Sequence, residues 1–209
     1  MVTHAELHEL LSMRRSVRRF KPDALPRALI ASLIASAVTA PSASNKQPWR
    51  FLVVQRRELI DAMAAAVRDA VERIARSIDP AFEASFRAYG DYFTRFEAAP
   101  ATIVPLFRPL TILSNMIVDG DVRAIRAMER DSGLIGTSLA MQNLLLAAHA
   151  AGLGASGMTG PLIAADELRA LLRVPRSWEI AALIPVGYPD ETPPPTARKS
   201  AETVTQWID

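Results

Sequence analysis

The chain has 209 residues, of which 50% are hydrophobic and 22% charged, a balance that suits one folded domain with a sizeable core. The 24 lysines and arginines exceed the 22 acidic residues by only +2, so no overall field favours nucleic acid as a partner. Cysteine is absent, which excludes disulfides, thiol nucleophiles and thiolate metal sites; redox chemistry here would need a cofactor. We expect a single domain over residues 1–209 and no metal site.

The first half of the chain is predicted to be mainly helical. Apolar residues recur at helical spacing in four stretches, and the second of these stops at Pro41. One short run, residues 49–54, is aromatic and β-branched and predicts a central strand. The predicted helices span residues 4–13, 26–38, 58–78 and 79–96.

The second half adds strands. Residues 101–107 predict a strand that lies at a sheet edge or ends early, because Pro105 cannot donate to a ladder. Residues 108–128 show no clear period and are expected to form a mobile loop over a site. Further elements are predicted as helices at 132–151 and 165–172 and as strands at 180–186 and 203–208.

Two apolar features point to packing surfaces. The helix at 132–151 is almost free of charge and apolar on most sides, which places it at the centre of the domain or in an interface. An aromatic stripe recurs at three- and four-residue intervals and is interpreted as core or dimer packing in preference to a substrate box. The stripe comprises Phe82, Phe86, Tyr89 and Phe93.

The order of these elements predicts an α+β or α/β sheet wrapped by helices. The stiff spacer of Pro193 to Pro195 could let the last predicted strand reach the sheet of a neighbouring subunit. Charged residues close to the N-terminus and the lack of an eighteen-residue apolar run predict a soluble, cytoplasmic protein without a membrane segment.

Residues 14–20, here called the arginine segment, read Arg-Arg-Ser-Val-Arg-Arg-Phe. Guanidinium groups bind phosphate through paired donors and a serine hydroxyl adds another, so the segment could grip a phosphorylated cofactor. A basic helix end that merely complements the helix dipole is an equally simple explanation. A nucleic-acid module built on the same arginines is disfavoured by the balanced charge of the chain.

Residues 40–51, the polar loop, and residues 152–161, the glycine segment, are the other two candidates. The polar loop offers serine, asparagine and glutamine on a proline-framed backbone that could read the edge of a planar ring, or could simply connect a helix to a strand. Glycines in the third stretch permit close approach to a flat ligand, or cap a helix. Arg198 and Lys199 add cationic donors or form an exposed tail.

Taken in order, these stretches resemble the nitroreductase family from about residue 8 to the C-terminus. The motifs that carry the resemblance are RRSVRRF, APSASNKQPWRF, MQNLLLAAHAAGLG and LIPVGYP followed by RKSAETV. The resemblance implies an α+β, three-layer α/β/α sandwich with a mostly antiparallel central sheet, a homodimer with C-terminal strand exchange, and one FMN at each of two subunit interfaces.

The resemblance also assigns cofactor-binding residues. Arg14, Arg15 and Ser16 match the segment that holds the FMN phosphate and ribityl chain, and Arg18 lies toward the pyrimidine ring. Arg198 and Lys199 match a basic pair at the phosphate, and Thr159 and Gly160 lie near the reactive nitrogen. The polar loop of the other subunit is expected to contact the ring through Pro41, Ser42, Ser44, Asn45 and Gln47. One residue of the helix at 58–78 is expected to approach the ring, with Arg68, Arg73 and Arg76 as candidates.

The implied activity is a ping-pong hydride transfer from NADH or NADPH through FMN to a nitroaromatic, a quinone or a similar electron-poor acceptor. No catalytic side chain is expected, because the flavin performs the chemistry. The alternatives are another reaction on the same scaffold, namely dehalogenation or flavin cleavage, and a flavin-binding protein without turnover.

Overall fold

The computed structural model describes residues 1–208. The helices are α1 (His4–Met13), α2 (Arg27–Ala37), α3 (Arg57–Ala75), α4 (Pro80–Gly90), α5 (Arg123–Ala150), α6 (Ala165–Leu171) and α7 (Ala201–Val204). The strands are β1 (Trp49–Val54), β2 (Ala101–Phe107), β3 (Gly154–Ala155), β4 (Glu179–Ile180) and β5 (Ile184–Gly187). Short 3-10 turns are η1 (Ala43–Asn45), η2 (Asp91–Ala98) and η3 (Gly160–Ala164).

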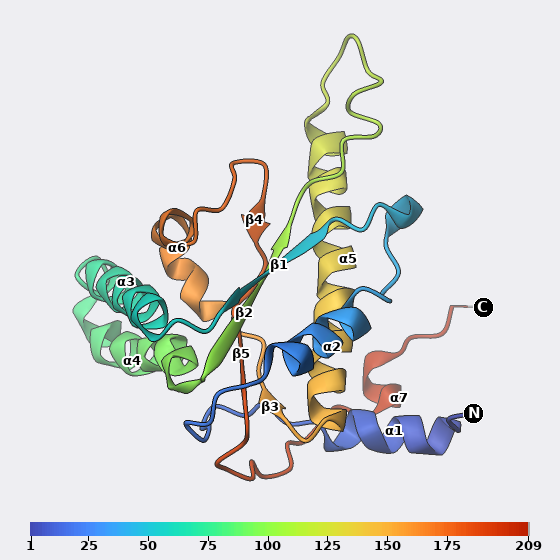
Figure 1. Cartoon of the computed structure of the whole chain (residues 1–209). Coiled ribbons are helices and arrows are strands. Elements are labelled where there is room, and N and C mark those ends of the chain that lie inside the picture. The colour runs from blue at the N-terminus through green and yellow to red at the C-terminus, as the bar shows by residue number, and fades with distance from the viewer. Residues whose placement is uncertain (209) are drawn as a thin grey trace.

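The strands form one sheet between two layers of helices, with α3, α4 and α6 on one face and α2 and α5 on the other (Figure 1). The sheet order is β1-β2-β5-β3, with β4 also paired to β2, and these strand pairs are all antiparallel. Successive residues of β2 point to opposite faces, so that Ile103 packs with α2 and α5 whereas Val104 packs with α3. The expected three-layer α+β sandwich is confirmed.

Helix α3 shows why the helical periods predicted well. Ile60, Met63, Ala64 and Val67 recur at three- and four-residue intervals and are at most 1% exposed, and charged residues occupy the opposite face. Burial of one such stripe stabilises the helix more than local propensity does. The predicted helices at 26–38 and 58–78 accordingly match α2 and α3 closely. The predicted helix at 4–13 matches α1, although α1 buries none of its residues within the single chain.

Helix α5 is longer than predicted, because it begins at Arg123 and takes in part of the expected loop. The buried side of this helix consists mostly of its small residues and Leu144. On another side, Ile135 is 60% and Leu139 43% exposed. The helix is therefore central to the domain on one side and open on the other. Within residues 1–208, none of the helices has the length and apolar composition needed to cross a membrane.

Strand β2 is central, so the prediction that Pro105 places it at an edge or ends it early is wrong. Ala181 N–H donates to the carbonyl of Pro105 at 2.9 Å, and the N–H and C=O of one strand residue point to the same side. On that side the pairing with β5 ends at Ile103 and the pairing with β4 begins at Leu106. The missing donor thus falls in the gap between two short partner strands.

The same gap divides the single strand predicted at 180–186. Leu183 leaves the ladder of β2 and exchanges two backbone hydrogen bonds with Met158, of 2.8 and 2.9 Å. The helix predicted at 79–96 is likewise divided, into α4 and the 3-10 turn η2. The glycine that closes α5 is as expected, because Gly152 has a φ of +71°.

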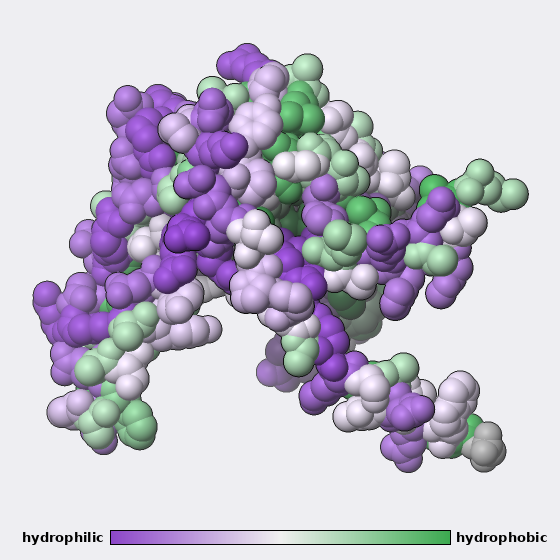
Figure 2. Space-filling model, turned by 90° about the horizontal axis from the view of Figure 1, so that it is seen from below, coloured by the Kyte–Doolittle hydropathy of each residue, from purple (hydrophilic) through white to green (hydrophobic). Residues whose placement is uncertain are grey.

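The strand predicted at 203–208 is wrong for its first residues, which belong to α7. Ser200 caps this short helix by accepting a hydrogen bond from Thr203 N–H at 3.2 Å. Residues 205–208 have no regular structure, and Trp207 and Ile208 are 84% and 89% exposed. In Figure 2 the C-terminal segment, at the lower right, stands away from the body of the molecule.

The aromatic stripe is not core within the single chain. Phe82 is 65% and Tyr89 64% exposed, and only Phe86 and Phe93 are half-buried. The stripe was expected to pack in the core or in a dimer, and the first possibility does not hold for its exposed members. The buried aromatic of this region is Phe96, which is fully enclosed against α3.

Candidate functional site

The arginine segment and the glycine segment lie side by side. Ser16 forms a parallel bridge with Ala155, and Val17 N–H donates to the carbonyl of Ala155 at 3.2 Å. A Cβ at Gly154 would lie 2.5 Å from Val17 Cγ1, so the close approach of the two chains depends on this glycine. The fold therefore joins two of the three candidate segments through backbone contacts between residues nearly 140 positions apart.

Cations gather at this junction. Burial lowers the pKa of the Arg14 guanidinium, and the nearby charges of Arg198 and Arg15 lower it further. Among residues 1–208, none of the ion pairs includes these three arginines. Arg15 donates instead to the backbone carbonyls of Ser12 and Arg14. The positive charges of these arginines repel one another, and no carboxylate of the described chain offsets the repulsion. An anionic ligand would do so, which suits the group to binding one.

Glu191 fixes the backbone of the arginine segment. Its carboxylate accepts hydrogen bonds from the N–H groups of Arg18 and Arg19, at 2.5 and 3.0 Å, and lies 3.4 Å from the Arg19 side chain. Burial opposes ionisation, but these donors and cations hold the pKa of Glu191 below its ordinary value. Glu191 could not be predicted from the sequence, because a contact across 173 positions leaves no local pattern.

Ser156 adds a buried polar atom without a partner. The residue is 1% exposed, and its Oγ makes no hydrogen bond within the described chain. It follows directly on Ala155, the bridge partner of Ser16. Because a buried hydroxyl without a partner is costly, the atom marks a place where a bound molecule or water would be stabilised.

The polar loop has a strained backbone. Ser44, Asn45 and Gln47 have φ angles of 48°, 50° and 45°, in the left-handed region that residues with a Cβ rarely adopt. Such conformations cost on the order of 1–3 kcal/mol each and gather at ligand sites. Ser42 stabilises the turn, since its Oγ accepts from Gln47 N–H and its carbonyl from Asn45 N–H, both at 2.9 Å. The three strained residues are exposed.

The polar loop lies far from the arginine segment of the same chain. Gly136 faces the loop, with a gap of 3.3 Å between its Cβ position and the Cβ of Ser42, whereas the glycine segment begins just beyond the end of α5. About fourteen residues of helix separate the two places, or roughly 20 Å. Figure 1 shows η1 beside the upper half of α5 and α1 near its lower end. Pro41 and the rest of the loop thus do not meet the arginines within one chain.

The remaining predicted residues have mixed environments. Thr159 is exposed at the start of η3, and a Cβ at Gly160 would collide with the ring of Phe93, so packing alone accounts for this glycine. Lys199 is exposed beside Arg198. Of the candidates on α3, Arg68 pairs with Glu97 and Arg73 with Glu167, both at 2.8 Å. Arg76 is exposed at the end of the helix.

The segment between β2 and α5 extends beyond the N-terminal end of α5 (Figure 1) and is tied down by a buried glutamate. Glu129 accepts hydrogen bonds from Ile112 N–H and Leu113 N–H, each at 2.6 Å, and from the Ser114 hydroxyl at 2.5 Å. The Ser114 hydroxyl lowers the pKa of Glu129 most, burial raises it, and the backbone donors lower it further, with a net decrease.

We expect Glu129→Gln to lower the melting temperature at neutral pH, because an amide cannot accept from all of these donors. The folded-state pKa of Glu129 lies below its ordinary value of 4.5. The stability that its charge contributes is therefore complete above pH 4.5 and disappears as the pH falls through the folded-state pKa. Melting curves of both proteins between pH 7 and pH 3 should converge in acid; a constant difference would contradict this assignment.

The model of the nitroreductase family matches residues 11–188. The chain belongs to the nitroreductase family. Its fold, which is confirmed above, is the fold of this family, and the family's members are oxidoreductases. The candidate site is therefore interpreted as the active site of an oxidoreductase.

Two curated relatives span almost the whole chain. An NADH dehydrogenase of Thermus thermophilus is 30% identical over 93% of this chain and 92% of its own length. An iodotyrosine deiodinase of Drosophila melanogaster is 34% identical over 95% of this chain and 68% of its own length. The relatives thus differ among themselves in the reaction that their names state.

Solved structures show the same fold. A BluB-like flavoprotein of Clostridium difficile has a TM-score of 0.86 and 24% identity, with 98% of this chain and 99% of that chain covered. A nitroreductase of Desulfitobacterium hafniense with bound FMN has a TM-score of 0.73 and 20% identity, with 97% of each chain covered.

Proposed function

We propose that the chain is an FMN-dependent NAD(P)H oxidoreductase that acts as a cytoplasmic homodimer on electron-poor acceptors such as nitroaromatics and quinones. The observation that carries the proposal is the group formed by Arg14, Arg15 and Arg198. Within residues 1–208 these arginines lack acidic partners. Ser16, which follows Arg15 in the chain, bridges to Ala155, and the next residue, Ser156, has a buried hydroxyl without a partner. A phosphorylated cofactor would supply the anion that the arginines require and an acceptor or donor for the serine.

The residues fit FMN in kind. Arg14, Arg15 and Arg198, with Lys199 beside them, would hold the phosphate, and Ser16 would contact the ribityl chain. Within residues 1–208 Arg18 forms no ion pair, and Glu191 fixes its backbone N–H. A cation there would stabilise negative charge on the pyrimidine side of a reduced ring. When bound, FMN supplies the hydride transfer, and the side chains orient it and adjust its electronics.

The separation within one chain favours a dimer. The polar loop lies about 20 Å from the arginines along α5, so both can touch one cofactor only if the loop comes from a second chain. Exposed apolar residues on α5, Ile135 and Leu139, lie on the side of the helix that such a partner would cover. The contacts of Ser44, Asn45 and Gln47 with the ring are thus proposed to be made across the interface.

Strand exchange has a candidate acceptor. Strand β1 is at the end of the sheet, and a cavity of about 530 Å³ beside it is lined by Ile34, Val53 and Leu59, among others. An exposed strand edge can pair with an extended segment of another chain. The partner's residues 205–208, with Trp207 and Ile208, are proposed to bind there.

Deletion of residues 200–209 is expected to weaken the dimer, because it removes the proposed exchange segment but leaves Arg198 and Lys199 in place. Trp207→Ser in the full chain is a milder version that retains the backbone pairing and should have a smaller effect in the same direction. Sedimentation over a range of concentrations measures the change. An unchanged dimer in the deletion variant would remove the case for strand exchange.

The main test of the proposed function is optical. The purified protein, with FMN added if needed, should show flavin absorbance that NADH or NADPH bleaches and that a nitroaromatic or quinone restores. Bleaching without restoration by any acceptor would indicate a flavin-binding protein without this turnover. A protein that binds no FMN would overturn the proposal.

Reductive dehalogenation is the second candidate, favoured by the 34% identity to an iodotyrosine deiodinase. It is distinguished by release of iodide from 3-iodotyrosine with the reduced protein under anaerobic conditions. Iodide release faster than nitroaromatic reduction would make dehalogenation the better description of the activity.

A further inference from the structure

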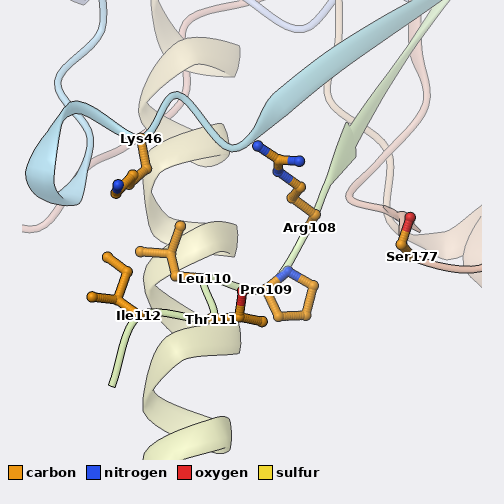
Figure 3. Close-up of a pocket in the computed structure, with 7 residues that line it drawn as sticks. All are labelled: Lys46, Arg108, Pro109, Leu110, Thr111, Ile112 and Ser177. Atoms are coloured by element: carbon orange, nitrogen blue, oxygen red, sulfur yellow. The ribbon is translucent and has the colours of Figure 1, made fainter. Parts of the chain in front are cut away.

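A second group of unpaired cations lines a cavity of about 510 Å³ at the other end of the chain's α5 helix, away from the arginine segment. Lys46 comes from the polar loop and Arg108 from the end of β2, where the segment that carries Leu110 and Ile112 begins (Figure 3). The lining residues are Lys46, Arg108, Pro109, Leu110, Thr111, Ile112 and Ser177. No carboxylate is among them.

Arg108 is held without an acidic partner. Its guanidinium lies 5.5 Å from the centre of the Trp178 ring, and that of Arg50 lies 4.6 Å from the same ring. Trp178 is only 8% exposed, so the indole is a fixed support for both arginines. Among residues 1–208, no ion pair includes Lys46, Arg50 or Arg108.

The acidic residues close to the cavity are already occupied. Glu129 accepts hydrogen bonds from the segment that forms the cavity wall, and Glu179, beside Trp178 in the chain, pairs with Arg130 at 2.7 Å. The positive charge of Lys46 and Arg108 is therefore not neutralised locally. The bonds to Glu129 also fix the wall, so the cavity does not depend on a freely moving loop.

The rest of the lining defines the ligand further. Pro109, Leu110 and Ile112 provide an apolar surface, and Thr111 and Ser177 add hydroxyl groups. Lysine and arginine donors with an apolar wall suit a molecule that has a hydrophobic body and an anionic group. Lys46 directly follows Asn45, so the cavity begins about 4 Å along the chain from a residue proposed to touch the ring.

We propose that this cavity binds a carboxylate or phosphate group of a substrate, with Lys46 and Arg108 as its ligands. That the bound molecule is a substrate rests on the proposed function. Two sources of the anion are possible: a carboxylate on the electron acceptor, or a phosphate of the nicotinamide donor. The shared chemistry is a paired, charge-assisted contact with both cations.

Binding is measured directly, so that the result is independent of turnover. The probes are 4-nitrobenzoate, its uncharged analogue 4-nitrobenzamide, and NADP⁺, which carries the phosphates of NADPH but cannot reduce FMN; each is titrated calorimetrically into the purified oxidised holoprotein. The variants are Lys46→Met and Arg108→Gln. Arg95→Gln is the control, because Arg95 is exposed on η2, forms no ion pair within residues 1–208 and does not line the cavity. Lys46 is exposed, so its replacement should not disturb folding, and melting curves verify this.

If the anion belongs to the acceptor, Lys46→Met and Arg108→Gln should each weaken 4-nitrobenzoate binding by about ten-fold or more, with little change for 4-nitrobenzamide. If it belongs to the donor, the same loss should appear for NADP⁺. Arg95→Gln should change neither. Lys46→Glu should have a larger effect than Lys46→Met in either case.

The proposal is overturned if the unmodified protein binds 4-nitrobenzoate no better than 4-nitrobenzamide and Lys46→Met leaves NADP⁺ binding unchanged. That result would stand even where NADPH bleaches the flavin normally, and the proposed function would then survive without this subsite. Conversely, selective anion binding in a protein that transfers no hydride would keep the subsite and overturn the function.

Discussion

Arg14→Gln combined with Arg198→Gln is expected to weaken FMN binding by at least about a hundred-fold. A hydrogen bond to a charged group contributes roughly 1.5–3 kcal/mol, so loss of two such contacts at the phosphate costs about 3–6 kcal/mol, or about 10²–10⁴ in affinity. Glutamine keeps most of the length of each side chain, so the change is mainly one of charge. Fluorescence titration of the apoprotein with FMN measures the dissociation constant.

The apoprotein of this double variant should be at least as stable as the unmodified apoprotein. Burial and the neighbouring arginines lower the pKa of Arg14, which means that its charged form is disfavoured in the folded state. Removal of the charge relieves that penalty. A purely structural role for these arginines predicts the opposite, namely a lower melting temperature without FMN.

Arg95→Gln is a suitable control for this experiment, since it removes an exposed arginine from η2 that is not part of the arginine group. It should leave both the FMN dissociation constant and the melting temperature close to their original values. Retention of FMN at the original affinity in the double variant would show that the phosphate pocket has been placed wrongly.

Helices α2 and α3 could be predicted because each buries a stripe with a helical period. In α3, Ile60, Met63 and Val67 identify the buried side without any knowledge of the neighbours. That Pro105 fits a central strand could not be predicted, because it depends on where the two partner strands of β2, β4 and β5, stop pairing with it. The rule for proline in strands states only that Pro105 has no N–H donor. Whether the sheet needs a donor at that position depends on the pairing register.

For the candidate site, the sequence predicted which types of residue take part but not how they are arranged in space. The arginine and glycine segments were each noticed separately, but their contact through Ser16 and Ala155 depends on the whole fold. Glu191 and the left-handed backbone of Ser44 are invisible to any local pattern. The Ser200 cap of α7 was readable as a helix start, yet the alternating residues after it favoured a strand.

Gly133→Ala is expected to destabilise the protein by about 2 kcal/mol, although alanine is the better helix former by about 1 kcal/mol. A Cβ at position 133 would collide with the backbone carbonyl oxygen of Arg108, which cannot rotate away as a side chain could. Arg108 N–H also donates to the carbonyl of Pro48 at 3.1 Å, so the strand end cannot shift without loosening the polar loop. The steric cost should therefore exceed the gain in propensity.

Gly136→Ala provides the matched control, since it lies one turn later in α5 and gains the same helix propensity. Its Cβ would lie 3.3 Å from the Cβ of Ser42, a gap that a few tenths of an ångström of loop movement relieve. Its stability should stay within about 1 kcal/mol of the original. In thermal melts the Gly133 variant should lose about 4–8 °C, given the usual dependence of melting temperature on stability at this chain length.

The Gly133 variant also links stability to the anion cavity. Displacement of Arg108 would move its guanidinium relative to Trp178 and Lys46, so 4-nitrobenzoate affinity should fall in Gly133→Ala and be retained in Gly136→Ala. A Gly133 variant that melts at or above the original temperature would mean that helix propensity outweighs the collision, and that the end of β2 yields more easily than its hydrogen bond to Pro48 indicates.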